Sequence, residues 1–441
     1  MNITALICIA STLAYKPEQI HIALTGIPHE TQITWTTQQL TFKNRILYGS
    51  RINEHCYFDS INDNIHIKRF NNDKNNDNKN TLITGRITFI YHSVIDNLLP
   101  GHEYCYKIRN SQENSFTYHF KMFDYNKNNT KILVMGDMDI SNETIASIQH
   151  YLKYTNVDFI LHNGDIAYDL YEQNGKVGDD YMNAIQDITA HHYYMTSPGN
   201  HERTYNFSHY KNRFRNRNLV HERHSNYFWS IDTKYAKIIT INTDLYYDDE
   251  GKPLLEPVNN IGNPLVQFDW LEKEVCNYRK NKKTQHNWII IFGHHPLYCS
   301  NINSKKLIST CMGPDNQTYI MRNGWTDKRL GSLEDLFKKY KVNLYISSHV
   351  HAYERLYPTL YGKIVQYNYT NPQTYVHLMT GNAGVNNDMD VFTTILPFSA
   401  KRINGTMVGY GILNIVNSTQ LKWKQLNAKT HIVVDEMTLL L

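Results

Sequence analysis

The sequence predicts an α/β protein in which a β-sandwich domain precedes an α/β layered domain. Residues 16–122 contain short segments that alternate apolar and polar residues between turns, the pattern of strands with one buried face. From residue 130 on, the apolar runs are nearly continuous, as in strands buried on both faces, and helical stretches separate them. The chain has 441 residues, of which 41% are hydrophobic, so it is long enough to form more than one core.

The amino-terminal residues, MNITALICIASTLA, form an apolar stretch that ends in small residues. This predicts a signal peptide over residues 1–15, with a buried first strand as the alternative. Glycosylation sequons agree with a secreted or vesicular, lysosome-like protein; they begin at Asn128, Asn142, Asn206, Asn316, Asn368, Asn404 and Asn417. The formal net charge of +4 argues against a nucleic-acid partner, and the sequence lacks an apolar run of about 20 residues that would span a membrane.

The sequence contains six cysteines, one of which, Cys8, lies in the predicted signal peptide. Five remain, so one thiol is expected to be free. Cys299 and Cys311 lie in a loop-like stretch and are predicted to form a disulfide. Cys56 and Cys105 are candidates for a second bridge, and the sequence leaves their pairing open.

Six segments of the amino-terminal region are predicted strands: QITWTT, NRILYGS, IHIKRF, RITFIYHSVI, EYCYKI and TYHFKMF. The stretch LLPGHEYCYKI, which contains Pro100, Gly101 and Tyr104, resembles the tyrosine corner of fibronectin-III-like domains. A domain of this type is therefore expected over residues 16–123. The polar stretch at 71–80 is predicted to be a solvated loop insertion.

In the second region, six apolar runs are predicted strands: KILVMGD, VDFILHNGD, YYMTSPGNH, AKIITINTD, NWIIIFGHH and VNLYISSHVH. The stretches at 142–154 and 267–280 are predicted helices. The residues from about 373 onward are again β-like. In a layered α/β domain, ligand sites gather at the carboxyl ends of strands, where each of these runs ends in polar residues.

The polar residues at these ends suit a metal centre: Asp137, Asp165, Tyr168, Asn200, His201, His294, His295, His349 and His351. Carboxylate and amide oxygens together with imidazoles suit divalent and trivalent first-row metals. Seven candidate ligands are too many for one ion and about right for two, provided that one carboxylate bridges them. His349 and His351 are expected on one side of an extended segment, facing the metal pair.

Five motifs occur in a fixed order: GDMD (136–139), GDIAY (164–168), GNHE (199–202), IFGHH (291–295) and SHVH (348–351). They resemble the signature of the purple acid phosphatases within the calcineurin-like metallophosphoesterases, and the likeness to the larger plant and animal type covers nearly the whole chain. The resemblance implies a calcineurin-like αββα metallophosphoesterase sandwich over residues 130–370. It also implies a segment at 371–441 that completes this catalytic domain.

The resemblance also implies the role of each site residue. The first metal, Fe(III), would be held by Asp137, Asp165, Tyr168 and His351. The second, a divalent Fe, Zn or Mn, would be held by Asp165, Asn200, His294 and His349, with Asp165 bridging. His201 and His295 would be catalytic. Asp139 and Ser348 depart from the family pattern, because glycines stand at their positions in relatives.

Tyr168 has a physical reason to be in this set. A free tyrosine ionises near pH 10, but a trivalent ion can displace the phenol proton and bind the phenolate. The packing alternative, in which Tyr168 only contacts a following helix, is less favoured because Asp165 lies three residues before it.

The expected function is hydrolysis of small phosphate monoesters by an acid phosphatase, with a metal-bound hydroxide as nucleophile and His201 or His295 as proton donor. The nearest alternative is a phosphodiesterase or nucleotide-cleaving enzyme on the same scaffold. A phosphatase-like cell-surface binding protein without activity is a third alternative, and metal content would distinguish it.

Overall fold

The structure is a computed structural model that describes residues 14–72, 86–215, 226–247, 263–284, 287–300, 302–303, 308–309, 317–325, 329–384, 390–392 and 396–441. Most of the predicted signal peptide and polar insertion, together with Cys311 and Asn316, lies outside these residues. The chain divides into two compact units. One comprises residues 1–125, 169–195 and 207–222, and the other comprises 126–168, 196–206 and 223–441.

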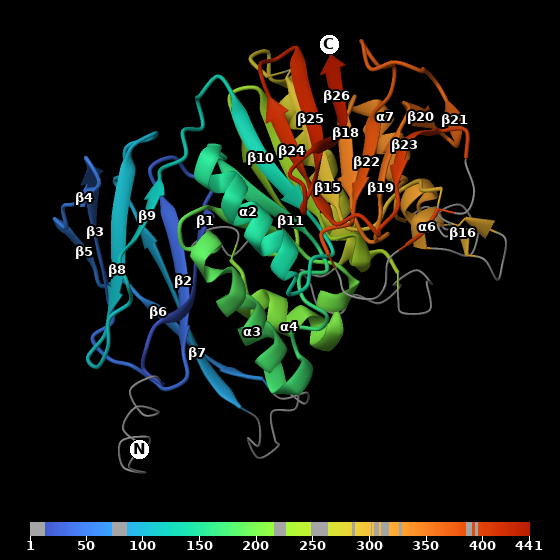
Figure 1. Ribbon diagram of the computed structural model, residues 1–441. Coiled ribbons are helices and arrows are strands. Elements are labelled where there is room, and N and C mark those ends of the chain that lie inside the picture. Colours follow the sequence, from blue (N-terminus) through green and yellow to red (C-terminus); the bar gives the residue numbers. More distant parts are fainter. Residues whose placement is uncertain are drawn as a thin grey trace. The chain divides into compact units, whose positions relative to one another are not determined.

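The first unit contains two antiparallel sheets, so the predicted β-sandwich is confirmed (Figure 1). One sheet has the order β1-β2-β7-β6, and the other has the order β4-β3-β8-β9 with β5 paired to β3. The strands are β1 (Glu18–Leu24), β2 (Thr31–Thr37), β3 (Arg45–Ile52), β4 (His55–Cys56), β5 (Ser60–Asn62), β6 (His66–Asn71), β7 (Ile87–Ile95), β8 (Glu103–Arg109) and β9 (Tyr118–Lys121). All six segments predicted as strands are strands, whereas β1 is an additional one.

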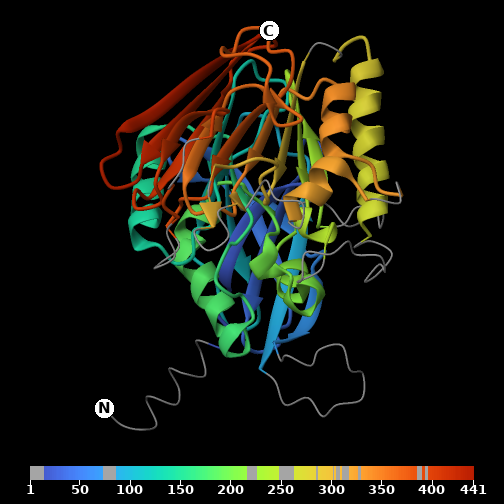
Figure 2. The ribbon, with the colours of Figure 1, turned by 90° about the vertical axis from the view of Figure 1, so that its right-hand side faces the viewer.

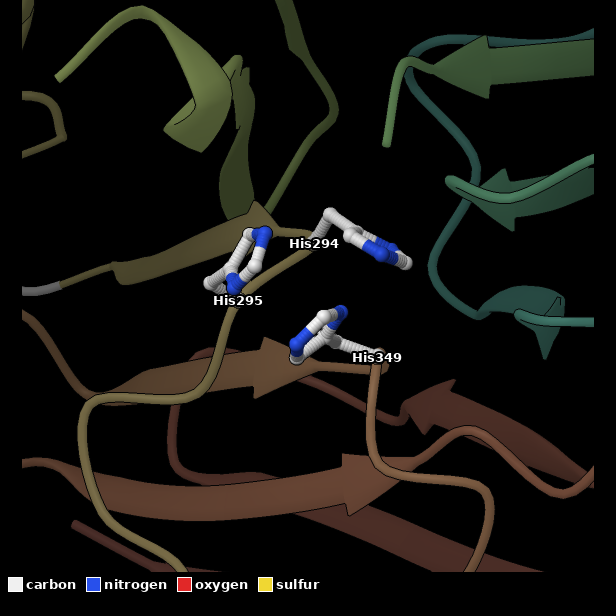
Figure 3. Close-up of side chains that lie close together, drawn as sticks. All are labelled: His294, His295 and His349. Atoms are coloured by element: carbon white, nitrogen blue, oxygen red, sulfur yellow. The ribbon is translucent and has the colours of Figure 1, made fainter. Parts of the chain in front are cut away.

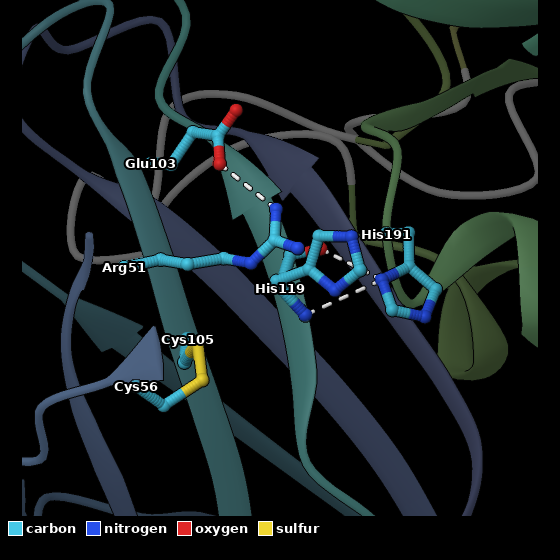
Figure 4. The surroundings of a disulfide bond; sticks show 6 residues. All are labelled: Arg51, Cys56, Glu103, Cys105, His119 and His191. Carbon is cyan, nitrogen blue, oxygen red and sulfur yellow. Dashed lines mark hydrogen bonds and ion pairs between the residues drawn. A yellow bond between two sulfur atoms is a disulfide. The ribbon is translucent and has the colours of Figure 1, made fainter. Parts of the chain in front are cut away.

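The tyrosine corner is present at the start of β8. The backbone N–H of Leu99 donates to the phenol oxygen of Tyr104 at 2.7 Å. A disulfide joins Cys56 to Cys105, and close to it an ion pair links Arg51 to Glu103 at 2.9 Å (Figure 4). The bridge closes a loop of 49 residues, which in the chain-entropy account stabilises the fold by roughly 4 kcal/mol. Among the described residues, Cys276 is a free thiol, as the odd number of cysteines predicts.

Two helices from the middle of the chain also belong to the first unit: α3 (Glu172–Thr189) and α4 (Thr204–Arg213), of which α4 begins in the other unit. α3 packs against β1, where Gln186 accepts from the backbone N–H of Ile20 at 3.0 Å. The buried Arg213 of α4 forms an ion pair with Asp179 of α3 at 2.7 Å. The segment that follows Tyr168 therefore packs on the sandwich.

The second unit contains two larger sheets, and its αββα architecture confirms the predicted fold. The first sheet has the order β12-β11-β10-β24-β25-β26. Its strands are β10 (Thr130–Met135), β11 (Phe159–Asn163), β12 (Tyr194–Ser197), β24 (Gly409–Ile415), β25 (Gln420–Asn427) and β26 (Val433–Leu440). The helix α2 (Asn142–Tyr154) lies on this sheet, where Ser147 meets Tyr410 of β24 at 3.1 Å.

The second sheet has the order β13-β14-β15-β18-β22-β19-β23. Its strands are β13 (Trp229–Asp232), β14 (Ala236–Ile241), β15 (Trp288–Gly293), β18 (Leu344–Ser347), β19 (Tyr353–Leu356), β22 (Val376–Thr380) and β23 (Ser399–Ile403). The outer face is covered by α5 (Pro264–Lys280) and α7 (Leu333–Lys339), which share a core with β15 and β18 (Figure 2). Smaller elements are α6 (Gln317–Asn323) and the strands β16 (Ile302–Asn303), β17 (Ile308–Ser309), β20 (Thr359–Leu360) and β21 (Lys363–Ile364).

All six apolar runs of the second region form strands, and the predicted helices correspond to α2 and α5. The strands β14, β15, β18 and β22 are parallel to one another, so their carboxyl ends lie at one edge. No helix of the described residues is long and apolar enough to cross a membrane. Among the described sequons, Asn128, Asn142, Asn368 and Asn404 are exposed, whereas Asn206 and Asn417 are half-buried.

Candidate metal centre

The predicted ligands lie in loops that follow strands of both sheets in the second unit. Asp137, Asp165 and Asn200 follow β10, β11 and β12 of one sheet. His294 and His349 follow β15 and β18 of the other sheet. The structure brings these side chains together at one edge of the sandwich.

The first group of donors is a compact triangle formed by Asp137, Tyr168 and His351. The phenol oxygen of Tyr168 lies 3.2 Å from Oδ1 of Asp137 and 3.1 Å from Nε2 of His351. The third side, between His351 and Asp137, measures 3.5 Å. Ligand atoms about 2.1 Å from one metal ion, at angles near 90–109°, are roughly 3.0–3.4 Å apart. The triangle therefore has the dimensions of one face of a coordination polyhedron.

The second group surrounds the amide oxygen of Asn200. This oxygen lies 3.1 Å from Nε2 of His294 and 3.0 Å from Nδ1 of His349. Oδ2 of Asp165 lies 3.2 Å from the same nitrogen of His294. These four side chains are the set that the sequence assigns to the second metal, and their separations again fit one ion.

Asp165 lies where a bridging carboxylate is needed. It contacts His294 of the second group directly, and ligand atoms of Asp137, Asp165 and His294 all lie within 4.8 Å of one another. Both carboxylates are buried. A pair of buried carboxylates at this separation requires a compensating positive charge, which metal cations supply.

The backbone that presents these ligands is bent. Asp137, Asp165 and His349 have positive φ angles of 59°, 49° and 69°, which non-glycine residues adopt rarely. Hydrogen bonds hold two of these bends: the N–H of His349 donates to Oδ2 of Asp137 at 2.9 Å, and that of Asp137 donates to the carbonyl of Gly164 at 3.2 Å. Gly164 itself has a φ of 83°, and a Cβ there would lie 2.4 Å from Nδ1 of His294. The glycine of the GD motif is therefore required by close approach as well as by backbone conformation.

Asn163, at the end of β11, joins the two sheets beside the centre. Its side-chain amide donates to the carbonyls of Gly293 and Ile346, each at 3.2 Å. Its backbone carbonyl lies 3.0 Å from Nδ1 of His294 and accepts from it, which leaves Nε2 free for a metal. The sequence analysis did not assign a function to this buried residue.

Glu202 is a second residue that the sequence analysis did not assign, although it lies in the GNHE motif. Its buried carboxylate accepts from the N–H groups of Gly199, Asp165 and Ile166 at 2.8–2.9 Å. Burial and the charge of Asp165 raise the pKa of Glu202 to about 8. Glu202 therefore ties the GNHE loop to the GDIAY loop and fixes the backbone of the bridging aspartate.

The prediction that residues 349–351 form an extended segment is wrong. The N–H of Val350 donates to the carbonyl of Ser348 at 2.8 Å, and that of Ala352 donates to Val350 at 2.7 Å, so the chain turns tightly. These two-residue turns are incompatible with an extended strand. They direct Nδ1 of His349 to the second group and Nε2 of His351 to the first.

His201 and His295, the predicted catalytic residues, lie in different surroundings. The side chain of His201 is 33% exposed, and its ring lies 4.2 Å from that of Tyr168. His295 is only 1% exposed, and its ring lies 3.8 Å from that of His349 (Figure 3). Of the two imidazoles, only that of His201 is accessible to a substrate.

The two departures from the family pattern do not remove a ligand. The buried hydroxyl of Ser348 lies 3.3 Å from the amide of Asn163, and a Cβ at Gly136 would lie 2.1 Å from it. Ser348 therefore fills space above Gly136. Asp139 is half-buried and has a positive φ of 53°.

The charges of the centre favour a bound cation. Burial opposes ionisation of Asp165, yet the charge of His294 lowers its pKa well below the usual range. Burial disfavours the charged form of His294, but the carboxylates of Asp165 and Asp137 raise its pKa to about 10. For Tyr168, burial and the charge of Asp137 both raise the pKa well above 10. Tyr168 thus needs a strong local positive charge to ionise.

Comparison with known proteins agrees with this geometry. Residues 130–353 match the family described as calcineurin-like phosphoesterase, and residues 17–122 match the purple acid phosphatase N-terminal domain. Residues 375–436 match the family described as iron/zinc purple acid phosphatase-like protein C. Acid phosphatase type 7 of Mus musculus is 31% identical over 423 residues, which cover 93% of this chain and 87% of the relative. The chain belongs to the purple acid phosphatase family.

Other similarities extend along the chain of this purple acid phosphatase family member. Acid phosphatase type 7 of Homo sapiens is also 31% identical, over 427 residues that cover 93% of this chain and 87% of the relative. The purple acid phosphatase PPD1 from yellow lupin (Lupinus luteus) shares the fold with a TM-score of 0.74 at 18% identity, covering 97% of this chain and 74% of that one. The protein is therefore a phosphatase enzyme of the metallophosphoesterase type, with candidate metal ligands in its described residues.

Proposed function

We propose that this protein is an acid phosphatase that hydrolyses small phosphate monoesters at a dinuclear Fe(III)–M(II) centre, where M is Fe, Zn or Mn. The observation that carries the proposal is the pair of donor groups that share Asp165. Each group has donor separations of 3.0–3.5 Å. When bound, two such metals supply an acidified water as nucleophile and positive charge for the phosphoryl oxygens.

Tyr168 supports Fe(III) in the first group. Its phenol is half-buried beside Asp137, and both burial and negative charge oppose its ionisation. A divalent ion offers less charge to overcome this opposition than a trivalent ion does. The second group contains an amide oxygen, a carboxylate and two imidazoles, which suit a divalent first-row metal.

The side chains of the protein have distinct tasks in this reaction. Glu202 and Asn163 hold the loops of the bridging Asp165 and of His294 in place. His201 is the accessible imidazole beside the centre, with Nε2 3.9 Å from Oδ2 of Asp165. It is placed to bind a phosphoryl oxygen or to donate a proton to the leaving alkoxide, and general acid catalysis of this kind contributes about 10²–10⁴-fold.

The test is metal analysis of the purified protein together with hydrolysis of a chromogenic phosphate monoester and a diester between pH 4 and pH 8. We expect two metal ions per chain and faster monoester hydrolysis at acid pH. His201→Ala should lower kcat by about 10²-fold or more without loss of metal. A protein that purifies without metals after expression in metal-replete medium, or that cleaves only the diester, would refute the proposal.

The predicted location is part of the proposal. A secreted or vesicular, lysosome-like compartment is acidic or oxidising, which suits both an acid phosphatase and the disulfide between Cys56 and Cys105. Four of the described sequons are exposed and accessible to glycosylation. Secretion from a eukaryotic host, followed by removal of residues 1–15, is the expected result of expressing the full chain.

A further inference from the structure

Three neighbouring parallel strands end in residues that line up beside the second group of donors. β14, β15 and β18 are adjacent in the sheet, and Ile241 of β14 is paired with Gly293 of β15. Asp244 follows β14, His295 follows β15 and His349 follows β18. The order of strands in the sheet therefore places His295 between a carboxylate and a candidate ligand of the second metal.

Asp244 and His295 form a buried pair. Their exposed fractions are 0% and 1%, and Oδ1 of Asp244 lies 3.4 Å from Nε2 of His295. The backbone on both sides is held: the N–H of His295 donates to the hydroxyl of Thr243 at 3.1 Å, and the hydroxyl of Tyr345 donates to the carbonyl of His295 at 2.6 Å. The pair therefore lies on a fixed part of the sheet edge rather than on a loose loop.

Polar atoms of this pair are unsatisfied within the part of the chain that the structure describes. Neither ring nitrogen of His295 has a hydrogen bond of standard geometry, and neither has Oδ2 of Asp244. Oδ1 of Asp244 accepts only a long hydrogen bond from Tyr247, at 3.3 Å. Burying such groups without partners costs several kcal/mol, so their placement in contact with each other needs a reason.

The neighbour of His295 supplies that reason. Its ring centre lies 3.8 Å from that of His349, whose Nδ1 faces the oxygen of Asn200 at 3.0 Å. In Figure 3 the ring of His349 has one nitrogen on the side of His294 and the other on the side of His295. A metal-bound imidazole usually donates its second N–H to an acceptor, which fixes its tautomer and orientation.

We propose that Asp244, His295 and His349 form a hydrogen-bonded chain that sets the tautomer of His349 for the second metal. The carboxylate of Asp244 accepts from Nε2–H of His295, so Nδ1 of His295 carries the lone pair. That lone pair accepts from Nε2–H of His349, so Nδ1 of His349 presents its own lone pair to the metal. Asp244 and His295 are thus positioning residues, and this inference rests on the proposed second metal site.

The test uses variants of the full-length protein that separate hydrogen bonding from packing. His295→Phe keeps a ring over His349 and removes both nitrogens, and Asp244→Asn keeps the size of the side chain and removes its charge. Tyr247→Phe is the matched control, because it removes the other contact of Asp244 and leaves the chain intact. For each protein, the readouts are metal content after dialysis against a chelator, the affinity for added Zn²⁺ or Mn²⁺ and circular dichroism.

His295→Phe and Asp244→Asn should each weaken the second metal by about 10–100-fold. Both should fold and retain the first metal, and Tyr247→Phe should keep the wild-type affinity. Wild-type affinity in His295→Phe, parallel loss of both metals, or an equal loss in Tyr247→Phe would each overturn the inference. If the wild-type protein itself takes up fewer than two metals, the proposed function fails instead, so the two failures are distinguishable.

Discussion

The phenol oxygen of Tyr168 lies 3.1 Å from Nε2 of His351, although the two residues are 183 positions apart in the sequence. Tyr168 follows a strand of one sheet, and His351 follows a strand of the other. Their contact at the edge of the sandwich converts two unremarkable loop residues into two donors for one ion. It also gives Tyr168 a role that a packing residue does not have, and this difference can be measured.

Tyr168→Phe should fold, lose its visible colour and hold Fe(III) less well. The phenylalanine keeps the ring contact with His201 at 4.2 Å and removes only the oxygen. A phenolate bound to Fe(III) gives a charge-transfer band, and a site that shifts to divalent metals should work at higher pH because its water is less acidic. Absorption spectra and a pH–rate profile test this. A variant that kept both the band and the acid optimum would mean that Tyr168 only packs.

Asn200→Ala and His349→Ala should release the second metal selectively, whereas Asp165→Ala should release both. The first two side chains contact only the second donor group, at 3.0 Å from each other, while Asp165 lies between the groups. We expect second-metal affinity to fall by at least tenfold in the first two variants, as for the loss of weaker outer-shell partners. Metal analysis at matched protein concentration is the measurement. Equal loss of both metals in all three variants would contradict the assignment.

Cys299 should be bonded to Cys311. Cys299 is buried and disulfide-bonded, while Cys311 lies outside the described residues, so this pairing remains a prediction. Closing a loop of about a dozen residues contributes roughly 3 kcal/mol and steadies the segment after His294. Peptide mapping of secreted protein checks the pairing, with Cys276 as the thiol that labels freely. Recovery of a labelled Cys311 from folded protein would rule the bridge out.

Acid should destabilise the fold through its buried neutral histidines, for example His377. Burial lowers the pKa of His377 to about 3, whereas the unfolded chain titrates near 6.5. Between these values the unfolded state binds more protons, so stability is full above pH 6.5 and falls as the pH drops. At pH 5 the loss from one such histidine is about 2 kcal/mol.

His377→Gln keeps a polar partner for Ser347, which lies 2.9 Å from Nε2 of His377, and removes the titration. Its Tm should therefore change less between pH 7.5 and pH 5 than that of the wild type. The exposed His150 on α2 offers a control, because His150→Gln should reproduce the wild-type pH dependence. Identical pH profiles for His377→Gln and the wild type would remove His377 as a cause of acid sensitivity.

Local patterns in the sequence determined the strands and the identity of the site residues. The continuous apolar runs that became β10, β11, β15 and β18 are readable because strands buried on both faces exclude polar residues over their whole length. Motif spacing then selected Asp137 and His294 among many loop residues, because polar residues at buried strand ends rarely have another reason to be there.

Only the tertiary structure decided how these residues divide the work. Whether His349 and His351 face one metal or two depends on the tight turns at 348–352, which no period in the sequence encodes. The burial of His295 against Asp244 depends on strand order, since β14 and β15 are neighbours only in the folded sheet. The sequence specifies which groups are available, and long-range packing sets their separations, because contacts between residues far apart along the chain form only when both sheets are in place.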